Sequence, residues 1–160
     1  MGKMVLTVFI GLLFIAAGAT ASFAHHAGGV EIGDLETGSV IGQPFKELPI
    51  DMDFHALENV GGKKVWYPPV AILSVRDRGS NPVVLKVTND TSSEHGFYLT
   101  AGDSYAPPSS LNVKIVLKPG ETKYIGIPTS DLTYTVVGNV LRYKCHLHEA
   151  HAGGQLLILK

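Results

Sequence analysis

The only cysteine of this chain stands beside three histidines, in the run Cys145-His146-Leu147-His148-Glu149-Ala150-His151. A thiolate and neutral imidazoles are the ligands that suit copper or zinc in proteins. The spacing Cys-x2-His-x2-His lets one tight loop present Cys145, His148 and His151 to a single metal ion. Any fold of this chain must therefore hold such a loop and bring a further ligand to it.

A fourth metal ligand has to come from another part of the chain, and His95 is the best candidate. It stands in Ser93-Glu94-His95-Gly96-Phe97, about fifty residues upstream of the cysteine and just after the apolar alternating run 83–89. Such a run predicts a half-buried strand. Two distant strand ends would then meet at one ion.

Two other chemistries fit the cysteine and the histidines less well. A structural zinc site with one cysteine and three histidines is chemically sound, but copper usually binds such ligands more tightly than zinc. A thiol nucleophile would need a helix pattern before it and an orienting Asn or Asp in the same stretch, and the sequence has neither. Our prediction is one mononuclear copper centre with the ligands His95, Cys145, His148 and His151.

From Val65 to Lys160 the chain resembles the cupredoxins. The residues that carry the resemblance occur in that family's order: Tyr67-Pro68-Pro69, Val87-Thr88-Asn89, His95-Gly96-Phe97, Leu117-Lys118-Pro119-Gly120 and Tyr143-Lys144-Cys145. The ligand loop is similar to the amicyanin type, Cys-x2-His-x2-Met, with His151 in the place of the methionine. The resemblance implies an all-β fold, a Greek-key β-sandwich, in which one histidine follows an early strand and the other ligands share the loop before the last strand.

The ligand set and the resemblance together imply a function. A thiolate with two imidazoles suits both oxidation states of copper, which favours one-electron transfer to a redox partner such as a cytochrome or an oxidase. By resemblance, His148 lies near the surface and forms the electron route. The weakly apolar docking rim around it would consist of Leu147, Ala150, Ala152 and Pro107-Pro108. We expect no enzymatic activity.

Two alternative functions stay open. One is copper handling, because the predicted export and histidine-rich mature amino terminus resemble the periplasmic green cupredoxins of bacterial copper tolerance. The partners would then be copper-handling proteins. The other is a red copper protein with small-molecule chemistry at an open copper position, as nitrosocyanin suggests. That likeness is partial, since nitrosocyanin has Glu where this chain has His95.

The first 24 residues predict a signal peptide. Lys3 supplies the positive end, 5–17 the apolar core and Ser22-Phe23-Ala24 a small-x-small cleavage site. Cleavage after Ala21 and an uncleaved anchor are the alternatives. We therefore expect an exported, periplasmic protein. It should have no membrane span after cleavage, because no second apolar stretch is long enough to cross a bilayer.

The composition agrees with one all-β domain, which we place at 48–160. The 9 prolines and 18 glycines, with abundant Val, Ile and Thr, favour strands and turns over helices. A formal net charge of −1 gives no electrostatic reason for binding nucleic acid. An unpaired thiol in an oxidising compartment is a liability unless it is buried or held by a metal, which supports a ligand role for the single cysteine.

The segment 25–47 is rich in glycine and small polar residues and predicts a flexible arm, ordered only where the domain holds it. Cleavage after Ala24 would make His25 the first residue, so that its free amine and its ring could bind copper with His26 beside it. His55 is the third residue of this candidate second, weaker copper site. It lies on the polar side of the alternating run 48–57.

Alternating apolar and polar residues also predict the other strands. The predicted strands are 48–57, 70–75, 83–89, 111–117, 122–127, 133–137, 140–145 and 156–159. We expect 70–75 and 83–89 to form a strand pair, and 111–117 and 122–127 to form a hairpin around Pro119-Gly120. Gly138-Asn139 predicts a turn before the strand that leads to the cysteine.

Overall fold

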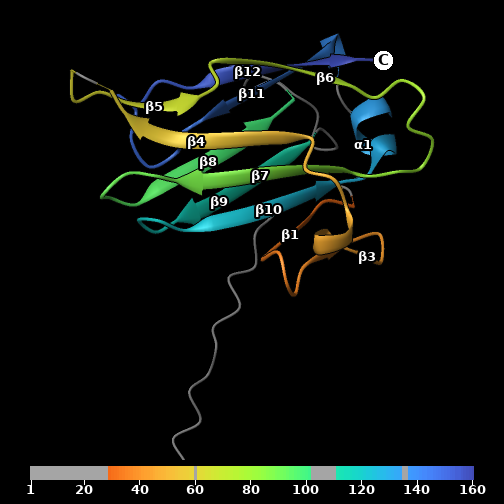
Figure 1. Cartoon of the computed structure of the whole chain (residues 1–160). Helices are drawn as coiled ribbons and strands as arrows, with labels where there is room; N and C mark the ends of the chain where they lie inside the picture. The colour runs from red at the N-terminus through yellow and green to blue at the C-terminus, as the bar shows by residue number, and fades with distance from the viewer. Residues whose placement is uncertain (1–28, 60, 102–110, 135–136) are drawn as a thin grey trace, which may run out of the picture.

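The computed structural model describes residues 29–59, 61–101, 111–134 and 137–160, so the predicted signal peptide lies outside the described residues. Two five-stranded sheets make up the fold (Figure 1). The first sheet contains, in spatial order, β1 (Glu31–Gly33), β10 (Thr122–Ile127), β7 (Val83–Asn89), β4 (Met52–Glu58) and β5 (Lys64–Tyr67). The second contains β6 (Val70–Ser74), β12 (Gly154–Leu159), β11 (Val140–Lys144), β8 (His95–Thr100) and β9 (Asn112–Leu117).

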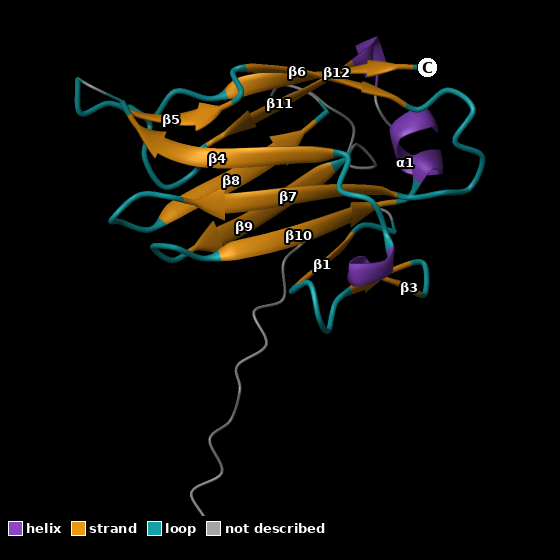
Figure 2. Cartoon of the chain, viewed as in Figure 1, coloured by secondary structure: helices purple, strands orange, loops and turns teal. Residues whose placement is uncertain are grey.

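The remaining elements are short. They are the strand pair β2 (Ser39–Val40) and β3 (Gln43–Pro44), the 3-10 turns η1 (Phe45–Glu47) and η2 (Val137–Asn139), and the helix α1 (Thr129–Tyr134). Figure 2 shows α1 at one end of the sandwich. The loop between β11 and β12 lies at the opposite end, because α1 leads towards the start of β11 and the loop follows its end. No helix among the described residues has the length and apolar character needed to cross a membrane.

The core lies between the two sheets, and strand alternation accounts for it. In β4, Phe54 and Ala56 are buried, whereas His55 between them is only partly covered. In β9, alternate residues from Val113 to Leu117 point inward in the same way. Each large side chain removed from water contributes about 2 kcal/mol to folding, so the inward faces of the two sheets hold the sandwich together. The predicted cupredoxin-type β-sandwich is confirmed.

The predicted hairpin around Pro119-Gly120 is wrong. The strand β9 pairs with β8 in the second sheet, whereas β10 pairs with β7 and β1 in the first. The turn at Pro119-Gly120 therefore carries the chain from one sheet to the other. Alternation has the same appearance in a hairpin and in such an arch, because both strands bury alternate residues in either case. For the same reason, the predicted pairing of 70–75 with 83–89 is wrong: β6 pairs with β12, and β7 with β10 and β4.

The predicted strand 133–137 is also wrong, because its first two residues belong to α1 and Val137 begins η2. Contacts from distant segments favour the helical turn. The Thr129 hydroxyl donates a hydrogen bond of 2.5 Å to the Asn81 carbonyl, and the Asp131 carboxylate accepts one from the Gly29 amide at 2.9 Å. Leu132 is fully buried. These contacts outweigh the strand preference of the neighbouring threonine and tyrosine residues.

The described part of the predicted arm packs on the domain. The strand β1 pairs with β10 along its whole length, and Val30, Val40 and Phe45 are buried. Phe45 and Val40 occupy the space above Gly126, where a side chain on that residue would collide with both. The apolar side chains of residues 29–47 therefore hold this segment against the first sheet, so this part of the arm is not a free tether.

Candidate metal centre

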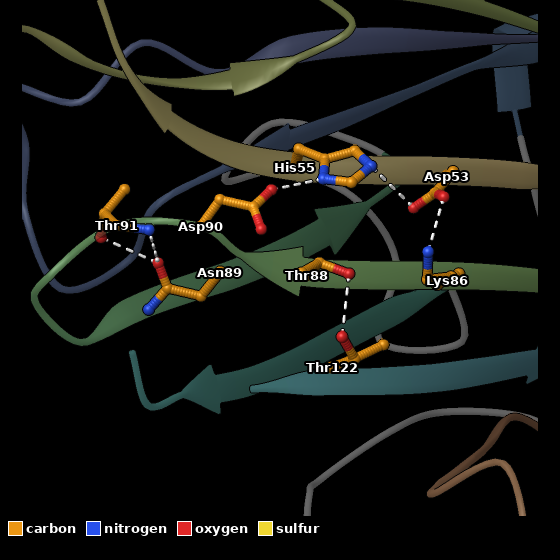
Figure 3. A network of polar contacts seen from close by, with 8 residues as sticks. All are labelled: Asp53, His55, Lys86, Thr88, Asn89, Asp90, Thr91 and Thr122. Atoms are coloured by element: carbon orange, nitrogen blue, oxygen red, sulfur yellow. Dashed lines mark hydrogen bonds and ion pairs between the residues drawn. The ribbon is translucent and has the colours of Figure 1, made fainter. Parts of the chain in front are cut away.

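A buried asparagine at the end of β7 positions His95. The side-chain amide of Asn89 donates to the Ser93 carbonyl at 2.7 Å and to the Leu117 carbonyl at 3.1 Å, and its oxygen accepts from the amide and hydroxyl of Thr91 (Figure 3). These bonds fix the turn between β7 and β8. Because His95 is the first residue of β8, the same bonds determine the position of its imidazole.

The end of β11 and the loop that follows supply the other three predicted ligands. Cys145 comes directly after the strand, and its side chain is buried. Its sulfur lies 3.5 Å from the Nδ1 of His148. The backbone of the loop turns back on itself, since the His151 amide donates to the His148 carbonyl at 3.3 Å. One short loop thus presents a thiol and two imidazoles on the same side.

The structure brings all four predicted ligand residues together. One ligand atom from each of His95, Cys145, His148 and His151 lies within 4.8 Å of the other three. The rings of His95 and His151 are stacked with centroids 4.6 Å apart, and those of His148 and His151 are 4.4 Å apart. The cluster combines two buried residues, His95 and Cys145, with a partly buried His151 and an exposed His148.

Burial and neighbouring positive charge lower the pKa of two histidines of the cluster, His95 and His151. Burial, followed by charge repulsion from His151, Lys64 and His148 in that order, lowers the pKa of His95 to about 4. The pKa of His151 is also lowered, first by burial, then by His148 and Lys64. Neutral imidazoles are the form that binds a metal. The imidazoles of His95 and His151 can thus bind a metal at neutral pH without first losing a proton.

Two buried ring nitrogens of the cluster have no hydrogen-bond partner within the described chain. They are the Nε2 of His95 and the Nδ1 of His151. A buried polar atom left in this way costs about 1 to 3 kcal/mol unless something pairs with it. A metal ion would supply that partner. With one sulfur and three nitrogen donors, the group can hold a copper ion.

Strand β5 secures the far end of the ligand loop, which the sequence pattern did not reveal. The Ala152 amide donates to the Lys64 carbonyl at 3.1 Å, and the Trp66 amide donates to the Ala152 carbonyl at 2.9 Å. The indole Nε1 of Trp66 donates to the Gly96 carbonyl at 3.2 Å, and its ring meets the His95 ring edge-on. Trp66 therefore contacts the residue after His95 and the residue after His151.

His146, the histidine of the loop outside the ligand spacing, packs against β8. Its ring lies where a side chain on Gly96 would project, so only glycine fits there. Its Nδ1 is buried and has no hydrogen-bond partner among the described residues. Burial lowers the pKa of His146, with a further contribution from Lys114. The loop is therefore held on two sides, by β5 through Ala152 and by β8 through His146.

The candidate second copper site is only partly within the described residues, because His25 and His26 lie outside them. His55 is described, on the outer face of the first sheet. Its Nδ1 lies 2.5 Å from a carboxylate oxygen of Asp90, and its Nε2 lies 3.1 Å from one of Asp53, which also pairs with Lys86 (Figure 3). Both ring nitrogens of His55 thus already face a carboxylate.

No protein-family model and no curated protein sequence matches this chain. Solved structures do resemble it. Auracyanin B has 15% sequence identity and a TM-score of 0.49, covering 70% of this chain and 91% of its own. Auracyanin from the photosynthetic bacterium Roseiflexus castenholzii has 12% identity and a TM-score of 0.48, covering 71% and 99%. A purple cupredoxin from Nitrosopumilus maritimus has 18% identity and a TM-score of 0.42, covering 68% and 99%.

Proposed function

We propose that this chain is an exported copper protein that carries single electrons. The observation that carries the proposal is the group of four donors, one thiol and three imidazoles, whose ligand atoms lie within 4.8 Å of one another. The residues that would hold the metal are His95, Cys145, His148 and His151. Copper bound there would supply one-electron chemistry, since sulfur and imidazole ligands suit both of its oxidation states.

The contribution of the protein is to hold these donors in place. The turn before His95 is fixed by the buried amide of Asn89. The loop that carries the other three donors is fixed at its end by the bonds of Ala152 to β5. Donors that are already in position need little rearrangement when the charge at the centre changes, which favours fast electron exchange.

The burial of the four donors also supports a carrier. His95 and Cys145 are shielded from solvent, whereas His148 is exposed. Leu147 beside it is 42% exposed. One imidazole of the group thus reaches the surface within a weakly apolar rim. We infer that electrons enter and leave through His148, to a redox partner such as a cytochrome or an oxidase.

Voltammetry of the copper-loaded protein tests the proposal. We expect a reversible one-electron wave and rapid exchange with a soluble cytochrome. The variant His55→Gln is a suitable control, because His55 lies outside the four-donor group and should leave the wave unchanged. An irreversible wave, or loss of copper on reduction, would contradict an electron carrier.

Copper handling in the same compartment is the second candidate. The observation in its favour is the fourth strong donor: an imidazole binds copper more firmly than the thioether found in the amicyanin-type loop, which suits retention of the ion. Growth of a deletion strain across a copper series separates the two functions. Sensitivity to copper, together with induction of the protein by copper, would favour handling over electron transfer.

The proposed export rests on the amino-terminal sequence, and it has its own test. The intact mass of the protein from the periplasm should correspond to cleavage after Ala24.

If His25 then begins the chain, a second and weaker copper should bind there. Copper titration of a form without His25 and His26 should remove that binding, and unchanged stoichiometry would contradict the second site.

A further inference from the structure

The second sheet has an unusual distribution of charge. Its five strands, β6, β12, β11, β8 and β9, contain no aspartate or glutamate. They contain three cations, Lys114, Arg142 and Lys144, all of them exposed. The whole chain, by contrast, carries a formal net charge of −1. A positive surface therefore lies on one face of a protein that is nearly neutral as a whole.

Tyr98 lies at the centre of this surface. It is the partner of Lys114 across the β8–β9 pair and of Lys144 across the β11–β8 pair. The Nζ of Lys114 is 4.7 Å from the centroid of the Tyr98 ring, and the Nζ of Lys144 is 5.9 Å from it. The ring attracts both cations through its π face, which holds two long side chains in place. We call Tyr98, Lys114, Arg142 and Lys144 the Tyr98 face.

The two lysines of the Tyr98 face lack anionic partners. Neither Lys114 nor Lys144 takes part in an ion pair within the part of the chain that the structure describes. Two positive charges held near the same ring repel each other, and an anionic group between them would relieve that repulsion. The arrangement is thus suited to receive negative charge from another molecule.

The Tyr98 face adjoins the metal centre along the backbone. Lys144 directly precedes Cys145. His146, which directly follows Cys145, packs against Gly96 of β8, the strand that carries Tyr98. The predicted sulfur ligand Cys145 is therefore next to a residue of the Tyr98 face, Lys144. A molecule seated there would lie beside Cys145, whose sulfur is 3.5 Å from the Nδ1 of the exposed His148.

We propose that the Tyr98 face is a docking surface for an acidic face of the redox partner. This inference rests on the proposed electron-carrier function. It adds that the docking face of the redox partner is negatively charged. Complementary charge at a docking surface raises the rate of encounter more than the affinity, which suits short-lived electron-transfer complexes. An acidic protein fits better than an anionic membrane, because the three cations of this face are fewer than the clusters of about four to eight that are typical of binding to anionic lipids.

Paramagnetic broadening of amide signals tests the surface without any copper. The probe is the trianion hexacyanochromate(III), added to the isotope-labelled metal-free protein at low salt. We expect broadening of the amides around Tyr98 in β8, β9 and β11. The variant Lys114→Gln/Lys144→Gln should lose it. The control Lys46→Gln/Arg76→Gln removes the same charge from two exposed residues, one in η1 and one after β6, and should keep it.

The outcomes are distinct. Broadening that is confined to the Tyr98 face and lost only in the first variant supports the proposal. Broadening that is spread over all exposed cations, or kept in the first variant, overturns it. Sedimentation with vesicles of equal parts phosphatidylcholine and phosphatidylserine, through the same two lysines, would also overturn it in favour of a membrane surface.

Electron exchange then tests the link to the metal centre. In the copper-loaded protein, one electron passes from the reduced centre to hexacyanoferrate(III), giving hexacyanoferrate(II). We expect Lys114→Gln/Lys144→Gln to slow this reaction about tenfold at low salt. It should not slow oxidation by the cation tris(phenanthroline)cobalt(III). An equal effect on both oxidants would contradict the docking surface, whereas failure of every form to exchange electrons would contradict the electron-carrier function.

Discussion

The imidazole rings of His95 and His151 lie stacked, with centroids 4.6 Å apart and planes inclined by 28°. His95 begins a strand in the middle of the chain, and His151 lies near the end of the ligand loop. Their stacking places an imidazole where the amicyanin-type loop has a methionine. The predicted fourth donor is therefore a second histidine, the partly buried His151. This arrangement determines the properties expected of the individual ligands.

Cys145 should be the source of the visible colour. In Cys145→Ser the sulfur donor is lost, so the sulfur-to-copper absorption band should disappear while the fold remains, since the two side chains are similar in size. The absorption spectrum of copper-loaded protein checks this. The variant His55→Gln should keep the band. Survival of the band without the thiol, or uptake of zinc alone by the native protein, would rule out this centre.

His151 should set the colour and the potential. Imidazole is a harder and stronger donor than a thioether, so a copper ion held by His151 would be stabilised as Cu(II). We expect a green or red protein with a low potential. The variant His151→Met should be bluer and have a higher potential, measured by absorption and voltammetry. An unchanged spectrum and potential in His151→Ala would show that this residue is not a ligand.

Trp66 should stabilise the centre before any metal is bound. In Trp66→Phe the Gly96 carbonyl loses its donor and a smaller ring leaves unfilled space, which should cost about 2 to 4 kcal/mol of unfolding free energy. Urea denaturation of the metal-free protein measures this, and copper should also dissociate faster. Tyr67 is 55% exposed, so Tyr67→Phe is a matched control that should change stability by less than about 0.5 kcal/mol.

Gly96 should be intolerant of a side chain. A Cβ on this residue would collide with the ring of His146. In Gly96→Ala the ring and the loop beside it must move, at a cost of about 1 to 3 kcal/mol. The double variant Gly96→Ala/His146→Ala should recover part of the loss, because the collision is gone. Thermal denaturation of the two single variants and the double variant checks this. If the stability losses of the single variants add up in the double variant, the two residues are not in steric conflict.

The metal-free protein should become less stable as the pH falls from about 6.5 towards 4. Folding lowers the pKa of His95 to about 4, so in this range the unfolded chain takes up a proton on His95 that the folded chain does not. Unfolding is then favoured by falling pH, by about 3 kcal/mol in total. Urea denaturation at a series of pH values measures the slope. It should be shallower in His95→Gln, and an equal slope in both proteins would contradict the assignment.

The grouping of the four candidate ligands could be predicted from the sequence because their chemistry is rare and their spacing is tight. A single thiol with His148 and His151 in one loop restricts the positions of three donors. Alternation gave the strand 83–89 with the bounds that β7 has in the structure. Local information was enough in both cases, since the loop and the strand are each defined by neighbouring residues.

The pairing of strands and the supports of the centre could not be predicted in this way. The two wrong pairings follow from alternation, which is the same whether the next strand lies in one sheet or the other. Trp66 and Asn89 act mainly through bonds to backbone carbonyls of distant segments, and any residue presents such a carbonyl. The helix α1 was missed because its burial depends on Leu132 and on contacts with 29 and 81.

The bonds between Ala152 and β5 have a mechanical consequence. His95 begins β8 and Cys145 directly follows β11, both strands of the second sheet, whereas the loop after Cys145 is tied through Ala152 to β5 of the first. A metal ion that binds His95, Cys145 and His151 would therefore link the two sheets at this end of the sandwich. The two layers could not part at that end until the ion left, because parting would pull its ligands away from one another.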